Sequence, residues 1–241
     1  MWIMYDSRSI QRENSTDDRR SFYRHNPTVK FSKGETIFLQ GDIPKHIYSI
    51  KSGVVEESNL TADGSKQSIA FEIIGDIIPK SWAFSKTDKT LFDYTAYTDC
   101  EFYIISKEDF QSQIAYNLDF TKKVLSRTIT SLMGAKLKLD ALEKPHASLK
   151  LMYTFRYMCY QYGTKVGTSV VMIQVPFTQQ DLADFTGLTR ETTNLEINKL
   201  RRQKIVSSDL RYYMVDIDKL NSLLDDGYES NTSMTMLPKR N

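Results

Sequence analysis

Short runs of alternating apolar and polar residues, separated by turn residues, fill the segment from Thr28 to Ile105. Glycines recur there every 7 to 12 residues, at Gly34, Gly41, Gly53, Gly64 and Gly75. Short strands with turns at this spacing predict an antiparallel barrel or sandwich. The Asp63–Gly64 pair predicts a tight hairpin turn, because both residue types tolerate the positive φ angles of such a turn.

After Glu108 the apolar period lengthens to that of a helix. Leu118, Leu125, Leu132 and Leu139 recur every seven residues. This pattern predicts one long helix over residues 111–144, which Pro145 ends. The apolar stripe on this helix needs a partner, and two alternatives are open. Either the stripe packs on the chain's own barrel, or it is the seam of a homodimer, formed by Leu118, Leu125, Leu132, Ala135 and Leu139.

The C-terminal part has the order of elements of a winged helix. "SLKLMYTFRYMCYQYG" is patterned as an apolar helix ended by Gly163, and "SVVMIQVP" as a strand. Residues 177–204 have the rhythm of two short helices broken at Gly187. Two β runs about a turn at Ser207–Asp209 and a closing helix follow. Helix, strand, helix-turn-helix and β-hairpin in this order predict a DNA-binding domain.

The predicted fold class is therefore α+β: an N-terminal antiparallel β-barrel, a long helix, and a C-terminal winged helix-turn-helix. The expected divisions are a flexible leader (1–20), the barrel domain (21–110), the long helix (111–144), the winged helix-turn-helix (145–228) and a flexible tail (229–241).

Composition excludes several classes of protein. The net charge of +2 over 241 residues names no partner by itself. Cys100 and Cys159 lie in apolar segments, which predicts two buried thiols and no disulfide framework. No apolar run approaches the roughly 18 residues that span a bilayer, and the N-terminus lacks a secretory signal pattern. We therefore expect a cytoplasmic protein without a membrane partner.

The sequence offers no constellation for catalysis. Its three histidines are scattered, and Gly-x-Ser-x-Gly, a phosphate-cradling loop and metal-ligand spacing are all missing. We predict no catalytic residue and no metal site.

The paired helices near Gly187 carry the signals of a helix-turn-helix. Thr178 is the expected N-cap of the first helix, with the Asp181 carboxylate near the unpaired amides of its first turn. Thr189 is the expected N-cap of the second helix. Gly187 suits the turn, where a Cβ would obstruct the bend. The expected buried residues of the first helix are Leu182, Ala183 and Phe185.

The second helix carries residue types that suit DNA. An arginine can bond guanine, a glutamate can accept from cytosine, and an asparagine can address adenine. The expected base-reading residues are Thr189, Arg190, Glu191 and Asn194. The expected phosphate contacts, which position without specifying, are Thr178, Gln179, Lys199, Arg201, Arg202, Lys204 and Arg211. The alternative is an amphipathic helical hairpin with a solvated charged face.

Two segments resemble the Crp/Fnr family of bacterial transcription regulators. "TQQDLADFTGLTRETTNLEINKLRRQKIV" resembles the family's helix-turn-helix signature, and "KGETIFLQGDIPKHIYSIKSGVV" resembles the start of its jelly-roll barrel, which is of the cyclic-nucleotide-binding type. The resemblance implies an effector-sensing barrel, a homodimer paired along the long helix, and a near-palindromic double-stranded DNA operator with half-sites ~34 Å apart. RNA polymerase is a further implied partner.

Departures from the family pattern argue against cyclic AMP as the effector. In members that bind it, a glycine–glutamate pair and a later arginine–serine/threonine–alanine triplet hold the ribose and the phosphate. Gly75–Asp76 stands near the first, but Thr90, Leu91 and Phe92 stand at the triplet, and the arginine is missing. Burying a phosphate without a cationic partner is costly.

A different small molecule remains open as an effector. The expected lining of its pocket is Phe71, Asp76, Trp82, Thr90, Phe92 and Tyr94. Aromatic residues in a barrel are explained equally well as core, so a ligand pocket and a filled core are both open.

No cofactor is predicted. Residues 1–99 contain no cysteine, so a cluster of iron and sulfur held by four cysteines is not expected. His25 and His46 are the candidate haem ligands, but a turn such as "IPKHIYS" favours a surface position for His46.

The recognition helix also departs from the family pattern, which often has an arginine at the position of Leu195. The departure removes one base contact or replaces it with an apolar contact to a thymine methyl group. The resemblance therefore implies an operator that is related to the family's commonest one but differs from it.

Together these features favour a dimeric, sequence-specific DNA-binding regulator whose barrel responds to a signal. A close variant is a dimer that is always competent and is controlled by its abundance. The rival is a barrel scaffold without a ligand that acts through protein–protein contacts, which predicts no saturable binding to duplex DNA.

Overall fold

The computed structural model describes residues 22–60, 66–209 and 211–231. These residues form two compact units, which divide between Leu132 and Met133. The predicted leader lies outside the described residues, and so does the predicted tail from residue 232 onward. The Asp63–Gly64 turn also lies outside them, although the strands on either side of it pair antiparallel, as in a hairpin.

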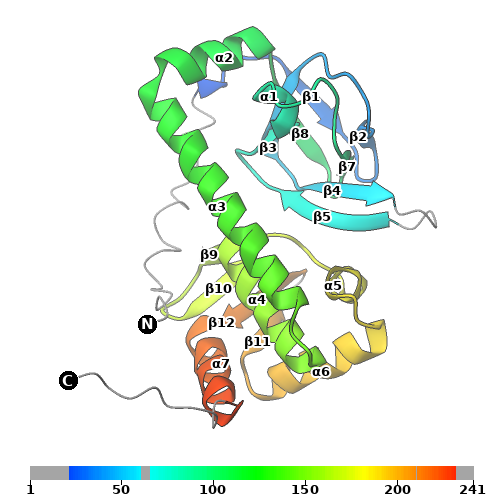
Figure 1. Cartoon of the computed structure of the whole chain (residues 1–241), viewed down its shortest axis with the longest axis vertical. Coiled ribbons are helices and arrows are strands. Elements are labelled where there is room, and N and C mark those ends of the chain that lie inside the picture. The colour runs from blue at the N-terminus through cyan, green and yellow to red at the C-terminus, as the bar shows by residue number, and fades with distance from the viewer. Residues whose placement is uncertain (1–21, 61–65, 210, 232–241) are drawn as a thin grey trace. The chain divides into compact units, whose positions relative to one another are not determined.

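The first unit contains two four-stranded antiparallel sheets. Its strands are β1 (Thr28–Phe31), β2 (Thr36–Phe38), β3 (Ile47–Ser52), β4 (Val55–Leu60), β5 (Lys66–Glu72), β6 (Ile77–Ile78), β7 (Asp93–Ala96) and β8 (Cys100–Ile105). One sheet has the order β1-β8-β3-β6 and the other β2-β7-β4-β5. In Figure 1 the paired strands β4 and β5 lie side by side. The first and last strands of the unit are neighbours, so the antiparallel β architecture predicted from the turn spacing is confirmed.

Apolar side chains from both sheets form a common core. Phe38 and Tyr94 come from one sheet, and Ile50 and Phe102 come from the other. Strand β8 is buried on both faces, since Phe102 lies in this core and the next residue, Tyr103, points to the opposite side and packs with the helices. The sheets are therefore held together mainly by burial of these side chains.

A second cluster joins the first sheet to the helices of the unit. The helices are α1 (Lys80–Ala83), α2 (Lys107–Tyr116) and α3 (Leu118–Leu142), the last of which runs past the division between the units. Trp82, Phe110 and Phe120 each come from a different helix and pack with residues of β3 and β8.

The single helix predicted over residues 111–144 is two helices in the structure. Asn117 separates α2 from α3, with an extended backbone at φ −114° and ψ 93°. Its side-chain oxygen accepts a hydrogen bond from the backbone N–H of Phe120 at 3.1 Å. Asparagine is a favoured N-cap because its oxygen satisfies an amide that has no partner within the helix. This local bond explains why a continuous apolar period contains a break.

The second unit combines α3's C-terminal part with a small sheet and further helices. These elements are α4 (Ala147–Tyr162), β9 (Gly163–Lys165), β10 (Val170–Ile173), α5 (Gln179–Thr186), α6 (Arg190–Arg202), β11 (Val206–Asp209), β12 (Tyr212–Asp216) and α7 (Ile217–Asn231). The sheet has the order β11-β12-β10-β9. Helix α4 ends at Gly163, as predicted, and most of its residues are buried.

The hairpin of β11 and β12 corrects the predicted turn. Ser207 and Asp209, which we assigned to the turn, lie in β11 and pair with Met214 and Tyr212 of β12. Strand β11 is an exposed edge strand in which only Val206 is buried. Its polar residues need no burial, so their composition resembles that of a turn.

One glycine of the first unit allows a close approach of two chain segments. Gly53 lies between β3 and β4 with a φ of 93°. A Cβ atom there would overlap the carbonyl oxygen of Asp99 and the thiol of Cys100. Gly34 has a similar φ of 89°, but a Cβ atom there would meet nothing within 4 Å.

We predict that Gly53→Ala lowers the free energy of unfolding more than Gly34→Ala does. Both substitutions carry the strain of a positive φ, roughly 1–2 kcal/mol. Only Gly53→Ala adds an overlap with packed atoms, which we expect to cost about 1–3 kcal/mol more. Urea denaturation followed by circular dichroism measures the difference. Equal losses at the two positions would contradict the close approach at Gly53.

Candidate functional site

The predicted capping residues fix the start of helix α5. The Thr178 side chain accepts a hydrogen bond from the backbone N–H of Asp181, and the Asp181 carboxylate accepts from the backbone N–H of Thr178 at 2.6 Å. This reciprocal capping box satisfies two amides that would otherwise lack partners. The buried residues of α5 include Leu182, Ala183 and Phe185, as predicted.

Gly187 makes the turn between α5 and α6 possible. Its φ of 67° and ψ of 24° lie in the left-handed region, and its N–H donates to the carbonyl of Ala183. The N–H of Leu188 donates to the same carbonyl at 3.1 Å. Glycine adopts this backbone conformation without the steric cost that a Cβ adds. The chain therefore bends within three residues and begins α6 at Arg190.

Helix α6 separates buried from exposed residues in the way that sequence predicted. Thr189 caps the helix by accepting from the N–H of Thr192 at 3.1 Å. Its inward residues are Thr193, Ile197 and Leu200, all of them buried. The four predicted base-reading residues are all exposed and follow one another on the outward side of the cap and first turns: Thr189, Arg190, Glu191 and Asn194.

The side chain of Asn194 is held by its neighbours. Its Oδ1 accepts a hydrogen bond from Gln179 Nε2 at 3.2 Å and another from Asn198 Nδ2 at 3.2 Å. Gln179 belongs to the first turn of α5, so this contact joins the two helices at their exposed surface. Gln179, which sequence predicted as a phosphate contact, thus also holds the side chain of Asn194 in position.

The predicted phosphate contacts are in different local states. Lys199 pairs with Glu196 at 2.6 Å, and Arg201 donates to Ser208 of β11 at 3.4 Å. Thr178 uses its hydroxyl group in the capping box. The remaining predicted cations are exposed and lie at the end of α6, just after it, or at the β11–β12 turn: Arg202, Lys204 and Arg211. Cations thus gather at the C-terminal end of α6, whereas the predicted base-reading residues lie at its N-terminal end.

The predicted seam residues of α3 are exposed. Leu125 and Leu132 are 58% and 56% exposed, and Leu118 is more exposed still. Ala135 and Leu139 are exposed as well. The opposite side of α3 carries Phe120, which is buried against the sheets. The alternative in which the stripe packs on the chain's own barrel is therefore wrong for the leucines of the first unit.

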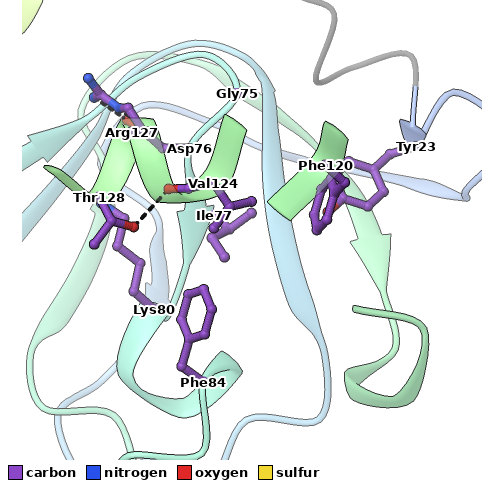
Figure 2. Close-up of a pocket in the computed structure, with 10 residues that line it drawn as sticks. All are labelled: Tyr23, Gly75, Asp76, Ile77, Lys80, Phe84, Phe120, Val124, Arg127 and Thr128. Carbon is purple, nitrogen blue, oxygen red and sulfur yellow. Dashed lines mark hydrogen bonds and ion pairs between the residues drawn. The ribbon is translucent and has the colours of Figure 1, made fainter. Parts of the chain in front are cut away.

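A small cavity lies beside α3 in the first unit (Figure 2). Its volume is about 30 Å³, which is room for one or two water molecules. Aromatic and aliphatic side chains form much of its wall, and charged groups lie at one end (Figure 2). Its lining is Tyr23, Gly75, Asp76, Ile77, Lys80, Phe84, Phe120, Val124, Arg127 and Thr128.

A buried ion pair lies at the wall of this cavity. The guanidinium group of Arg127 donates to both carboxylate oxygens of Asp76, at 2.6 and 2.7 Å. The Asp76 side chain is 0% exposed and that of Arg127 is 13% exposed. Two parallel hydrogen bonds from a guanidinium to a carboxylate are the strongest form of such a pair. The pair connects the loop before β6 to α3.

A second pair lies next to the first. The Lys80 ammonium is 2.6 Å from each carboxylate oxygen of Glu72. Burial raises the pKa of Glu72 because desolvation outweighs the attraction of Lys80. Burial alone would lower the pKa of Lys80, but the carboxylates of Glu72 and Asp76 outweigh burial and raise it. Two carboxylates thus face two cations, and each cation has a carboxylate partner.

The structure does not bring the six predicted pocket residues together around this cavity. Among them, Asp76 is the one that lines it. Phe71 packs on Tyr97. Tyr94 and Phe92 belong to the core between the sheets, and Trp82 lies in the second cluster. The Thr90 hydroxyl donates to the carbonyl of Leu39. The aromatic residues are therefore core, one of the two alternatives left open by sequence.

Sequence reasoning missed Lys80, Phe120 and Arg127 as lining residues. The helix that contains Arg127 carries many cations, and an exposed face already explains them. The composition of the helix therefore did not single out Arg127 as buried. The one available hint is spacing: Phe120, Val124 and Arg127 share a side of the helix different from that of the leucines.

Other predicted groups have ordinary surroundings. Cys100 and Cys159 are both buried, and burial raises the pKa of each thiol. His25 and His46 are exposed. The described residues contain no group of three or more His, Cys, Asp or Glu that could hold a metal ion. Among the helices described, none has the length and apolar character that crossing a membrane requires.

Comparison with known proteins identifies both parts of the chain. A cyclic nucleotide-binding domain matches residues 28–117, and a Crp-like helix-turn-helix domain matches residues 151–223. These domains in this order define a transcription regulator that binds DNA through its helix-turn-helix. The chain belongs to the Crp/Fnr family, whose members are regulators and not enzymes. The predicted family and fold class are thus confirmed.

Individual relatives are distant but extend over most of the chain. The anaerobic regulatory protein of Bacillus subtilis is 24% identical over 180 residues, which cover 75% of each protein. The nitrogen fixation regulation protein FixK of Bradyrhizobium diazoefficiens is 26% identical over 188 residues, covering 78% of this chain and 77% of FixK. The structure of FixK2 from Bradyrhizobium japonicum has a similar fold, with a TM-score of 0.66 at 20% identity over 82% of this chain and 96% of that one.

We predict that Arg127→Met lowers the free energy of unfolding by about 3–5 kcal/mol, because it leaves the buried Asp76 carboxylate without its cation. Adding Asp76→Asn should restore part of the loss by removing the uncompensated charge. Lys122→Met, which removes an exposed cation from the same helix, is the matched control and should have little effect. Urea denaturation measures the free energy of unfolding of these variants and of Asp76→Asn alone. If the double variant loses as much as the two single variants added together, the pairing is contradicted.

Proposed function

We propose that this regulator acts in the cytoplasm as a homodimer on a near-palindromic operator, under control that does not involve cyclic AMP. The observation that carries the proposal is the outward face of α6, where Arg190, Glu191 and Asn194 are exposed on a helix whose last turn is basic. The N-terminal turns of a recognition helix enter the major groove, where such side chains reach base edges.

Base reading and backbone binding fall to different residues in this proposal. Arg190 bonds guanine and Glu191 accepts from the amino group of cytosine. Arg202, Lys204 and Arg211 contact phosphates, and Lys199 and Arg201 join them by exchanging their present partners for phosphate oxygens. The wing hairpin supplies its contact next to that of α6, since Arg201 already bonds Ser208 of β11.

The dimer is supported by the exposed leucines of α3. Apolar side chains in a seven-residue repeat leave a stripe that a second α3 can cover in a coiled coil. A two-fold dimer carries two copies of α6, as a near-palindromic operator with half-sites ~34 Å apart requires. A dimer of this kind, bound near a promoter, can contact RNA polymerase.

The chemistry of the cavity supports control without cyclic AMP. A cyclic phosphate needs a cationic partner, but Arg127 and Lys80 are each committed to a buried carboxylate. At about 30 Å³ the cavity also has no room for a nucleotide. A small-molecule effector larger than a few water molecules must enlarge this cavity to bind in it, and it acts only by binding the DNA-competent state better than the other state. A dimer that is competent without a ligand fits the same observations.

We predict different effects for one reading residue and one phosphate contact. An operator is first selected as the bound duplexes from genomic fragments. Arg190→Ala should then reduce the binding free energy at this operator by ~1–3 kcal/mol and relax the sequence specificity at one base pair. Arg202→Ala should weaken binding to all duplexes alike, and it should reduce the slope of the logarithm of the binding constant against the logarithm of the salt concentration by about one. Lys86→Ala removes an exposed cation of the first unit and is the control. Absence of saturable duplex binding would favour the scaffold alternative instead.

We predict that the double variant Leu125→Glu/Leu132→Glu is a monomer. Carboxylates at the centre of the seam would have to be buried against the same charges of the partner helix. Sedimentation equilibrium measures the mass. Leu91→Glu, which changes a leucine that is 45% exposed elsewhere in the chain, is the control and should keep the parental mass. An unchanged mass in the double variant would contradict the seam.

A further inference from the structure

The middle of the exposed face of α6 holds an apolar residue. Leu195 is 64% exposed. Its neighbours on that face, Glu191, Asn194 and Asn198, are all polar. At 100° per residue, Leu195 points roughly opposite to buried Thr193 and Ile197. At this exposure Leu195 contributes little to the core, so its side chain is available to a partner that binds this face.

Asn194, next to Leu195, is restricted in what it can bond. Its Oδ1 already accepts from Gln179 Nε2 and from Asn198 Nδ2. No described residue accepts a hydrogen bond from its Nδ2 group. An asparagine with its oxygen occupied in this way offers a partner only donors. The bidentate adenine contact expected from sequence requires the oxygen to accept from the adenine amino group, so the observed orientation disfavours it.

A donor next to an apolar group matches one base edge. Thymine presents the O4 acceptor and the C5-methyl group in the major groove, whereas cytosine presents an amino donor, and guanine offers acceptors without a methyl group. We infer that Asn194 and Leu195 together read a thymine in each half-site, Asn194 donating to O4 and Leu195 contacting the methyl group. The inference rests on the proposed entry of α6 into the major groove.

Gln179 is the positioning residue in this arrangement. It lies in the first turn of α5 and reaches Asn194 across the two helices. By donating to Oδ1, it keeps the Nδ2 group of Asn194 turned outward. Removal of Gln179 and Asn198 frees the amide to rotate and present its oxygen, which would accept from an amino group on the base.

Modified pyrimidines separate the two contacts. In the selected operator, each thymine is replaced in turn by deoxyuridine, which lacks only the methyl group, or by 5-methylcytosine opposite guanine, which keeps the methyl group and replaces O4 with an amino group. At one thymine per half-site, deoxyuridine should weaken binding by the parental protein about fourfold, which is the contribution of one buried methyl group. At the same position, 5-methylcytosine should weaken it about tenfold, because two donors then face each other.

Protein variants assign each effect to its residue. In Leu195→Ala the deoxyuridine effect should vanish, while the 5-methylcytosine effect persists. In the double variant Gln179→Ala/Asn198→Ala the 5-methylcytosine effect should shrink to about twofold or less, while the deoxyuridine effect persists. Leu91→Ala, an exposed leucine of the first unit, is the control and should retain both effects. Circular dichroism checks that every variant is folded.

The outcomes distinguish this inference from the proposed function. If the parental protein selects no operator, the proposed function fails and this inference fails with it. If it selects an operator but no thymine shows a methyl effect that Leu195→Ala removes, only the thymine reading is wrong. The same holds if the methyl effect and the effect of 5-methylcytosine fall on different base pairs.

Discussion

The buried ion pair between Asp76 and Arg127 fixes which side of α3 faces the sheets. Phe120, Val124 and Arg127 share one side of the helix, and all three line the cavity. A rotation of the helix by one residue, about 100°, would separate two buried charges. Such a separation costs far more than the loss of one apolar contact. The exposure of the leucine stripe on the other side follows from this constraint.

The proposed DNA-reading face of α6 depends on constraints of much shorter range. Thr178 and Asp181 cap α5, Gly187 turns the chain, and Thr189 caps α6. Each acts on amides or carbonyls within four residues of itself. The buried residues of α6 then decide which side chains point outward. Because α5 and α6 also meet at the surface through Gln179 and Asn194, the reading face is organised before DNA arrives.

This difference in range explains what sequence could predict. The caps, the turn at Gly187 and the inward and outward sides of α6 depend on residues close together in the chain, and all were predicted. The cavity was not, because its central contact joins Asp76 to a residue 51 positions away. Periodicity has no information on such a pairing. The Asn117 break and the polar strand β11 were missed because a cap and an exposed edge strand look, in composition, like ordinary surface.

The exposed leucines of α3 make the proposed assembly subject to mass action. At low concentration the monomer prevails, and the amount of dimer then grows with the square of the amount of chain. Operator occupancy would therefore respond steeply to synthesis and degradation of the protein, even with no ligand at all. A stripe of side chains that an isolated chain leaves in water would thus turn protein abundance into a sharper signal.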